Sequence, residues 1–202
     1  MADPARPLCL PGPQAQVRRV PGRRPLPLAR TVHGRLRVLF GDPQIFAIQV
    51  DLTDHSNWLN GFCFYWIDGQ PFGDPEEHLS IDGMISSFIR TVKDGCDRAD
   101  PGLKTMMDAE AFDRLYRHLY GDDLLEEIDE PARFEITTDH AQFGDRLIYA
   151  VEAETGWYRL LIGSHDKGFE RAVRCPSVVL EDAFFDTYMY VNGITRVPSD
   201  NG

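Results

Sequence analysis

The densest set of potential metal ligands in the sequence lies in the stretch SHDKGFE, residues 164–170. It places His165, Asp166 and Glu170 within six residues, and such side chains can bind a divalent cation that assists hydrolysis. Their spacing matches no established metal-binding geometry, so a polar loop is the simpler interpretation. A metal-assisted hydrolase is kept as the alternative function, and the sequence predicts no catalytic, cofactor-binding or metal-binding residue.

A second chemical feature is an acidic segment, residues 122–130, which carries six carboxylates in nine positions. The calcium-loop pattern D-x-[DN]-x-[DN]-G is missing. The segment is therefore either a solvated loop or a negative patch for a basic partner, because such a patch speeds association and rejects wrong partners. Its candidate partner-binding residues are Asp122, Asp123, Glu126, Glu127, Asp129 and Glu130.

The remaining chemistry-bearing residues are scattered. Six histidines lie in segments typical of turns, helix surfaces or the basic N-terminal region, and the local signatures of hydrolases, nucleotide-binding proteins and zinc enzymes are missing. The four cysteines lie far apart, which favours reduced thiols over a disulfide frame. No apolar run approaches the roughly 18 residues of a membrane span, and no secretory signal is visible. These features favour a soluble intracellular protein, and the missing signatures do not by themselves decide whether it is an enzyme.

Charge divides the chain into two parts. Residues 1–37 contain eight arginines, one acid, seven of the 14 prolines and no aromatic residue, whereas residues 38–202 hold 13 basic and 31 acidic residues, a net charge of −18. The first part is predicted to be a disordered extension, because it cannot bury enough apolar surface. A nucleic-acid or membrane-binding arm and a transit peptide are less favoured, and upstream sequence before a start near Val38 is preferred. Residues 38–202 are predicted to form one domain.

The elements that must position these residues begin with strands. The stretches 45–52 and 61–67 are rich in β-formers, and Asp68-Gly69 predicts a type I′ hairpin with a short partner strand. Because the flanks of FCFYWI supply only turn and capping residues, this run is interpreted as core rather than as a pocket wall. A helix is then predicted from a cap at Asp74 to Gly95.

The second half of the sequence adds a second helix, further strands and a closing helix. A helix over 108–120 is followed by strands over 133–138, 146–153 and 157–163, by a further possible strand at RAVRCP, and by a closing helix through Leu180, Phe184, Tyr188 and Val191 that ends at Asn192-Gly193. Strands, two helices, strands and a helix predict an α+β fold, with a mostly antiparallel sheet and helices packed on one face.

Residues 38 to about 192 resemble the immunity protein 42 family of bacterial polymorphic toxin systems. The resemblance is carried, in order, by LFGDPQIFAIQVD, FCFYWIDGQPFGD, TVKDGCDR, LYRHLYG, RFEIT and EDAFFDTYMYV. It implies a small cytoplasmic α+β protein without catalytic activity, which binds and neutralises a cognate toxin domain. No motif of the family assigns residues to toxin contact.

The charge of residues 38–202 suits a basic toxin, such as a nuclease whose cleft attracts phosphate. Nanomolar binding requires about −12 kcal/mol, which charge seldom supplies alone, so exposed aromatic anchors are expected. The candidates for these anchors are Trp58, Trp157 and Tyr158, although core or hairpin packing is the simpler interpretation of each.

Overall fold

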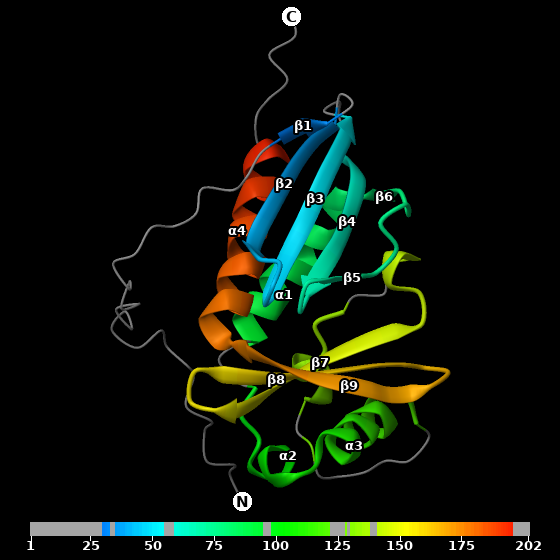
Figure 1. Cartoon of the computed structure of the whole chain (residues 1–202), viewed down its shortest axis with the longest axis vertical. Coiled ribbons are helices and arrows are strands. Elements are labelled where there is room, and N and C mark those ends of the chain that lie inside the picture. The colour runs from blue at the N-terminus through cyan, green and yellow to red at the C-terminus, as the bar shows by residue number, and fades with distance from the viewer. Residues whose placement is uncertain are drawn as a thin grey trace, which may run out of the picture.

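The computed structural model describes residues 30–32, 35–54, 59–94, 98–121, 128, 130–137 and 141–195. These residues form two antiparallel sheets and several helices, so the predicted α+β class is confirmed (Figure 1). The prediction of a single sheet needs correction, because the strands of the two halves of the chain do not join. The helices α1 and α4 pack on the larger sheet, whereas α2 and α3 pack on the smaller one (Figure 1).

The larger sheet has the strand order β1-β2-β3-β4-β5, and β6 pairs with β4. Its strands are β1 (Arg30–Val32), β2 (Arg35–Asp42), β3 (Phe46–Asp54), β4 (Asn60–Ile67), β5 (Gln70–Phe72) and β6 (Leu79–Ser80). Strand β1 and the start of β2 lie within the region predicted to be disordered. They are ordered there because β1 pairs with β2, and β2 pairs with β3 as far as Leu36. The rest of that region lies outside the described residues, and the division into an extension and one domain stays a prediction.

The turn between β4 and β5 has the geometry expected from its two residues. Asp68 and Gly69 both have positive φ, 54° and 72°, as a type I′ turn requires. The flanking residues Ile67 and Gln70 are paired in the ladder. The hairpin prediction is therefore confirmed, including its short second strand.

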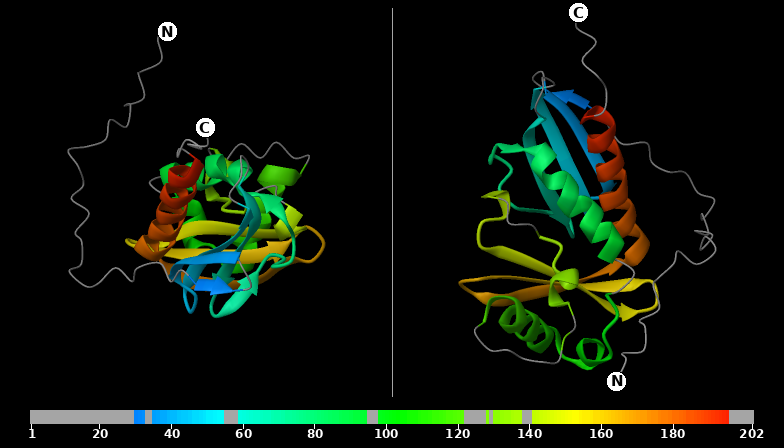
Figure 2. Two further views of the ribbon diagram at one scale, coloured as in Figure 1. Left: turned by 90° about the horizontal axis from the view of Figure 1, so that it is seen from above. Right: turned by 180° about the vertical axis from the view of Figure 1, so that it is seen from behind.

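Helices α1 (Ile85–Asp94) and α4 (Ser177–Thr195) cover one face of the larger sheet (Figure 2). Alternate residues of the strands face them, so that the Phe46 ring packs on Phe184, with centroids 5.6 Å apart, and Phe184 packs on Phe88. The prediction that FCFYWI belongs to the core is confirmed for Cys63, Tyr65 and Ile67, which are fully buried in this layer.

The first helix begins later than predicted. The Asp74 side chain accepts a hydrogen bond from the Glu76 backbone N–H at 2.8 Å, which closes a local turn instead of capping a helix. A short strand, β6, follows, and the helix starts as the 3₁₀ turn η1 (Ile81–Met84) before α1. The pairing of β6 with β4 therefore determines the structure of this segment in place of the local capping signal, and the helix begins after it.

The smaller sheet consists of β7 (Arg146–Glu154), β8 (Trp157–Ser164) and β9 (Gly168–Pro176), in that order. It is covered on both faces, which explains why its sequence is apolar on both. Ile148 and Ala150 join the core of the larger sheet, whereas the alternate residues Leu147 and Tyr149 join a second core. That second core is closed by α2 (Pro101–Thr105) and α3 (Asp108–Tyr120), which lie on the far side of the sheet (Figure 1).

The strand predicted over residues 133–138 is wrong for residues 133–137, and residue 138 lies outside the described residues. The chain there forms the 3₁₀ turn η3 (Pro131–Phe134) and a single bridge between Glu135 and Tyr149. The Thr137 hydroxyl accepts the hydrogen bond of the Ile148 N–H, so the strand ladder cannot continue. The short turn η4 (Ala141–Phe143) then leads into β7. The helix predicted over 108–120 and the later strands are confirmed, and the closing helix passes through Gly193 instead of ending there.

Candidate functional site

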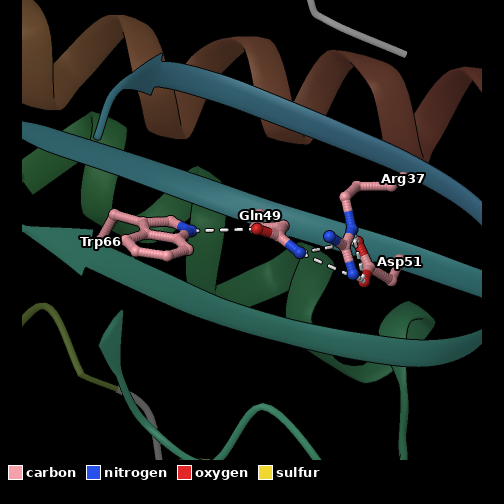
Figure 3. Close-up of polar contacts among 4 residues, drawn as sticks. All are labelled: Arg37, Gln49, Asp51 and Trp66. Atoms are coloured by element: carbon pink, nitrogen blue, oxygen red, sulfur yellow. Dashed lines mark hydrogen bonds and ion pairs between the residues drawn. The ribbon is translucent and has the colours of Figure 1, made fainter. Parts of the chain in front are cut away.

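The face of the larger sheet opposite α1 and α4 carries a row of polar and aromatic side chains. Arg37 of β2 is paired with Asp51 of β3, and Gln49 of β3 is paired with Phe64 of β4. Because side chains alternate along a strand and paired residues share a face, all four point to this face. Trp66 lies on the same face, and Figure 3 shows it in line with the polar residues, with the helices behind the strands. No described helix covers this face in Figure 1.

A chain of hydrogen bonds crosses β4, β3 and β2 on this face (Figure 3). The Trp66 indole N–H donates to Gln49 Oε1 at 3.0 Å, and Gln49 Nε2 donates to both Asp51 carboxylate oxygens at 3.0 and 3.1 Å. The Asp51 carboxylate also accepts from Arg37 Nε and forms an ion pair with its Nη2 at 2.9 Å. Asp51 and Gln49 are buried, whereas the Arg37 side chain is 48% exposed.

This arrangement is suited to recognition rather than to reaction. Each donor and acceptor of the central pair, Gln49 and Asp51, already has a partner within the network, so neither is poised to move a proton. Fixed rotamers lower the entropy that is lost when a partner binds. The network therefore holds an arginine at one end and an indole at the other in fixed positions.

A buried charged group lies among α1, η3 and β8. Arg98 is 1% exposed and donates to the carbonyl oxygens of Arg133 and Thr91, and its guanidinium lies 5.7 Å from the ring centroid of Tyr158. The Tyr158 hydroxyl donates to Glu181 at 2.7 Å. Burial lowers the pKa of Arg98, and burial together with the Glu181 carboxylate raises the pKa of Tyr158. These contacts connect β8 to α4 and have a structural role.

The residues considered for metal binding do not converge. The His165 ring packs on Tyr116 and Tyr120, with centroid distances of 5.6 and 4.6 Å. Glu170 pairs instead with Arg146 at 3.6 Å. Among the described residues, no three His, Cys, Asp or Glu side chains gather as a metal ligand set. The SHDKGFE stretch runs from Ser164 at the end of β8 through a polar turn to Glu170 in β9.

Three of the predicted partner-binding residues can be placed. Trp157 opens β8 and is 39% exposed, with the Arg174 guanidinium 5.3 Å from its ring centroid. Glu130 is exposed in a left-handed turn before η3. Tyr158 is 3% exposed, so its side chain belongs to the core rather than to the surface. The others lie outside the described residues: Trp58, Asp122, Asp123, Glu126, Glu127 and Asp129.

Sequence reasoning missed the polar network on the sheet face. The alternation of Gln49 and Asp51 in β3 and of Phe64 and Trp66 in β4 was a signal for it, because all four must share one face. The assignment of Arg37 to a disordered region concealed the partner of Asp51. Without the strand pairing, the network could not be assembled.

The fold is that of a small α+β protein, and the polar network on its larger sheet is suited to recognition. The profile of the family described as Immunity protein 42 matches residues 38–188, three quarters of the chain. The chain belongs to this family. It is a toxin-neutralising immunity protein and not an enzyme, and the resemblance seen in the sequence is confirmed.

The fold is also similar to a solved structure, "Crystal structure of CdiI from Burkholderia dolosa AUO158". The two share 17% sequence identity with a TM-score of 0.62, over 75% of this chain and 99% of the other. No curated protein matches the chain. Among the described residues, no helix is both long and apolar enough to cross a membrane.

Proposed function

We propose that the cognate toxin is a basic protein domain, such as a nuclease, and that this protein neutralises it in the cytoplasm by direct binding. The observation that carries the proposal is the net charge of −18 over residues 38–202. A nuclease cleft must attract phosphate and is therefore basic, and an acidic protein can occupy such a cleft in place of nucleic acid.

The acidic segment 122–130 and Trp157 are the proposed contacts. Six carboxylates in nine residues create a local negative field that would speed association with a basic toxin. Exposed aromatic side chains supply most of the binding energy in protein interfaces, and Trp157 is large and 39% exposed. Glu130, the exposed end of the segment, lies on the turn that leads into η3.

The proposal is tested by measuring the affinity of the purified protein for the toxin domain encoded beside it, over a range of salt concentrations. A basic toxin should bind more weakly by about tenfold or more between low and physiological salt, mainly through slower association. A constant Kd over this range, or an acidic toxin, would remove the electrostatic part of the proposal.

A matched pair of variants locates the charge effect. Glu126→Gln with Glu127→Gln neutralises two adjacent glutamates of the acidic segment, and Glu76→Gln with Glu77→Gln neutralises two adjacent glutamates elsewhere. The first variant should slow association by several-fold more than the second at low salt. Equal effects would assign the attraction to overall charge rather than to the acidic segment.

A further inference from the structure

The outward side of α4 is apolar. Its exposed residues are Val178, Asp182, Phe185, Met189 and Gly193, whose spacing of three or four residues places them on one stripe of the helix. Val178, Phe185 and Met189 are 52%, 43% and 51% exposed. Three of the six large hydrophobic side chains that are exposed in the described part of the chain therefore lie on this one stripe, the α4 stripe.

The folding of the domain does not require this stripe. The opposite side of α4 already supplies the core, where Leu180, Ala183, Phe184 and Val191 are buried under the larger sheet. A helix on the surface of a domain normally has polar residues on its outer side. Large exposed apolar residues that gather on one face, with charged residues among and beside them, are typical of an interaction site.

The charged residues of α4 itself are of one sign. Glu181, Asp182 and Asp186 are the charged residues of α4, which contains no lysine or arginine. Asp182 lies on the α4 stripe, between Val178 and Phe185, and Asp186 borders it. A complementary partner therefore has an apolar groove edged by basic side chains. A second copy of this helix would place carboxylates against carboxylates, which disfavours self-association.

The position of α4 suits it to docking. Figures 1 and 2 show α4 along the margin of the molecule, with one side against the larger sheet and the other outward. The helix follows directly from β9, and the Glu181 carboxylate is held by the Tyr158 hydroxyl of β8 at 2.7 Å. Because both sheets hold α4, the stripe is preorganised and loses little freedom when a partner binds.

We propose that the α4 stripe is the surface that docks the toxin, with Val178, Phe185 and Met189 inserted into a groove that basic side chains border. This inference rests on the proposed function, since the basic toxin is the partner whose charge fits. The acidic segment 122–130 then steers the encounter, and the α4 stripe provides the short-range contacts that hold the complex.

The test compares two variants of the full chain in binding to the toxin domain. Phe185→Gln with Met189→Gln replaces two of the three large apolar side chains of the stripe with residues that are tolerated in a helix. Met107→Gln is the control, because Met107 is 75% exposed at the N-cap of α3, away from α4. Thermal unfolding of each variant confirms that the fold is kept. Single changes Phe185→Gln and Met189→Gln serve if the double variant does not fold.

The inference predicts that the double variant raises the Kd for the toxin by about 100-fold or more, mainly through faster dissociation, while Met107→Gln changes it by less than about threefold. Binding of the folded double variant within about threefold of the wild type would overturn it. So would a dimer of the wild type that the double variant abolishes without loss of toxin binding. Failure of the wild type to bind any basic toxin would instead contradict the proposed function.

Discussion

The hydroxyl of Tyr158 on β8 donates a 2.7 Å hydrogen bond to the carboxylate of Glu181 on α4. The contact joins the smaller sheet to the helix that covers the larger one, beside the buried guanidinium of Arg98. Because the two sheets share no strand pairing, side-chain contacts of this kind and the shared apolar core hold them together.

We expect Tyr158→Phe to lower the free energy of unfolding by at least about 1 kcal/mol, because the hydroxyl loses its hydrogen bond to the Glu181 carboxylate and its interaction with Arg98 while the ring still packs. Tyr120→Phe is a matched control, since Tyr120 donates to Glu135 but is 41% exposed. Chemical denaturation measures both variants. A larger loss for Tyr120→Phe than for Tyr158→Phe would contradict the structural role of the Tyr158–Glu181 contact.

The network on the sheet face gives a second prediction. Asp51→Ala leaves Gln49 Nε2 without its acceptor in a buried site and should lower the free energy of unfolding by about 2 kcal/mol. Glu154→Gln alters a solvent-exposed ion pair with Arg174 and should change it by less than about 0.5 kcal/mol. Equal effects in denaturant titrations would mean that Asp51 is hydrated rather than buried.

Replacement by alanine is predicted to have opposite effects on stability at two glycines. A Cβ at Gly163 in β8 would lie 2.5 Å from Cζ of Phe112, which belongs to the core under α3, and it would also meet the Gly168 carbonyl. Gly163→Ala should therefore cost about 2 kcal/mol or more. A Cβ at Gly193 in α4 would meet nothing within 4 Å, and Gly193→Ala should be neutral or stabilising by up to about 1 kcal/mol. Thermal melting of the two variants distinguishes them; destabilisation by Gly193→Ala would contradict the helical environment described for it.

Alkaline pH should destabilise the protein. Burial raises the pKa of the Cys175 thiol from its ordinary value of 9.0 to about 12, and burial also raises the pKa of Cys63 and of Tyr65. Above about pH 9 the unfolded chain releases protons that the folded chain keeps. The stability present below pH 9 should therefore be lost progressively as the pH rises towards 12.

The pH prediction is checked by denaturant titrations at several pH values. The double variant Cys63→Ala with Cys175→Ala should show a shallower decline than the wild type, because two of the responsible protons are removed. A stability that is constant or rises between pH 9 and 11 would show that these groups ionise within the folded protein.

The sequence predicted well those parts of the fold that local chemistry controls. The helix Asp108–Tyr120 has a clear apolar stripe, and Asp68-Gly69 can adopt few other turns. The failures lie where long-range pairing competes with local preference, as at Asp74, where β6 formed ahead of a helix, and at Thr137, whose hydroxyl ends the pairing with β7. The helix α2 was missed although Asp100 caps it and Pro101 begins it.

The candidate surfaces were harder to predict than the fold. The sequence left Tyr158 open as a core residue or a surface anchor, because β8 is apolar on both faces and only the packing of Glu181 from α4 onto its hydroxyl shows that it is covered. The α4 stripe could have been found, since Val178, Phe185 and Met189 share a helical spacing opposite Leu180 and Phe184. What the sequence alone does not show is that α4 has the sheet on only one of its sides (Figure 2).

The central claim is that this chain protects a cell from a toxin, and growth rescue tests it most directly. The toxin domain encoded beside the chain is expressed in a heterologous bacterium with the full-length protein, with the protein carrying Phe185→Gln and Met189→Gln, or with an empty vector. The account predicts that the wild type restores growth and co-purifies with the toxin, while the empty vector does not protect. A toxin that arrests growth equally in the presence of the wild-type protein would contradict the account.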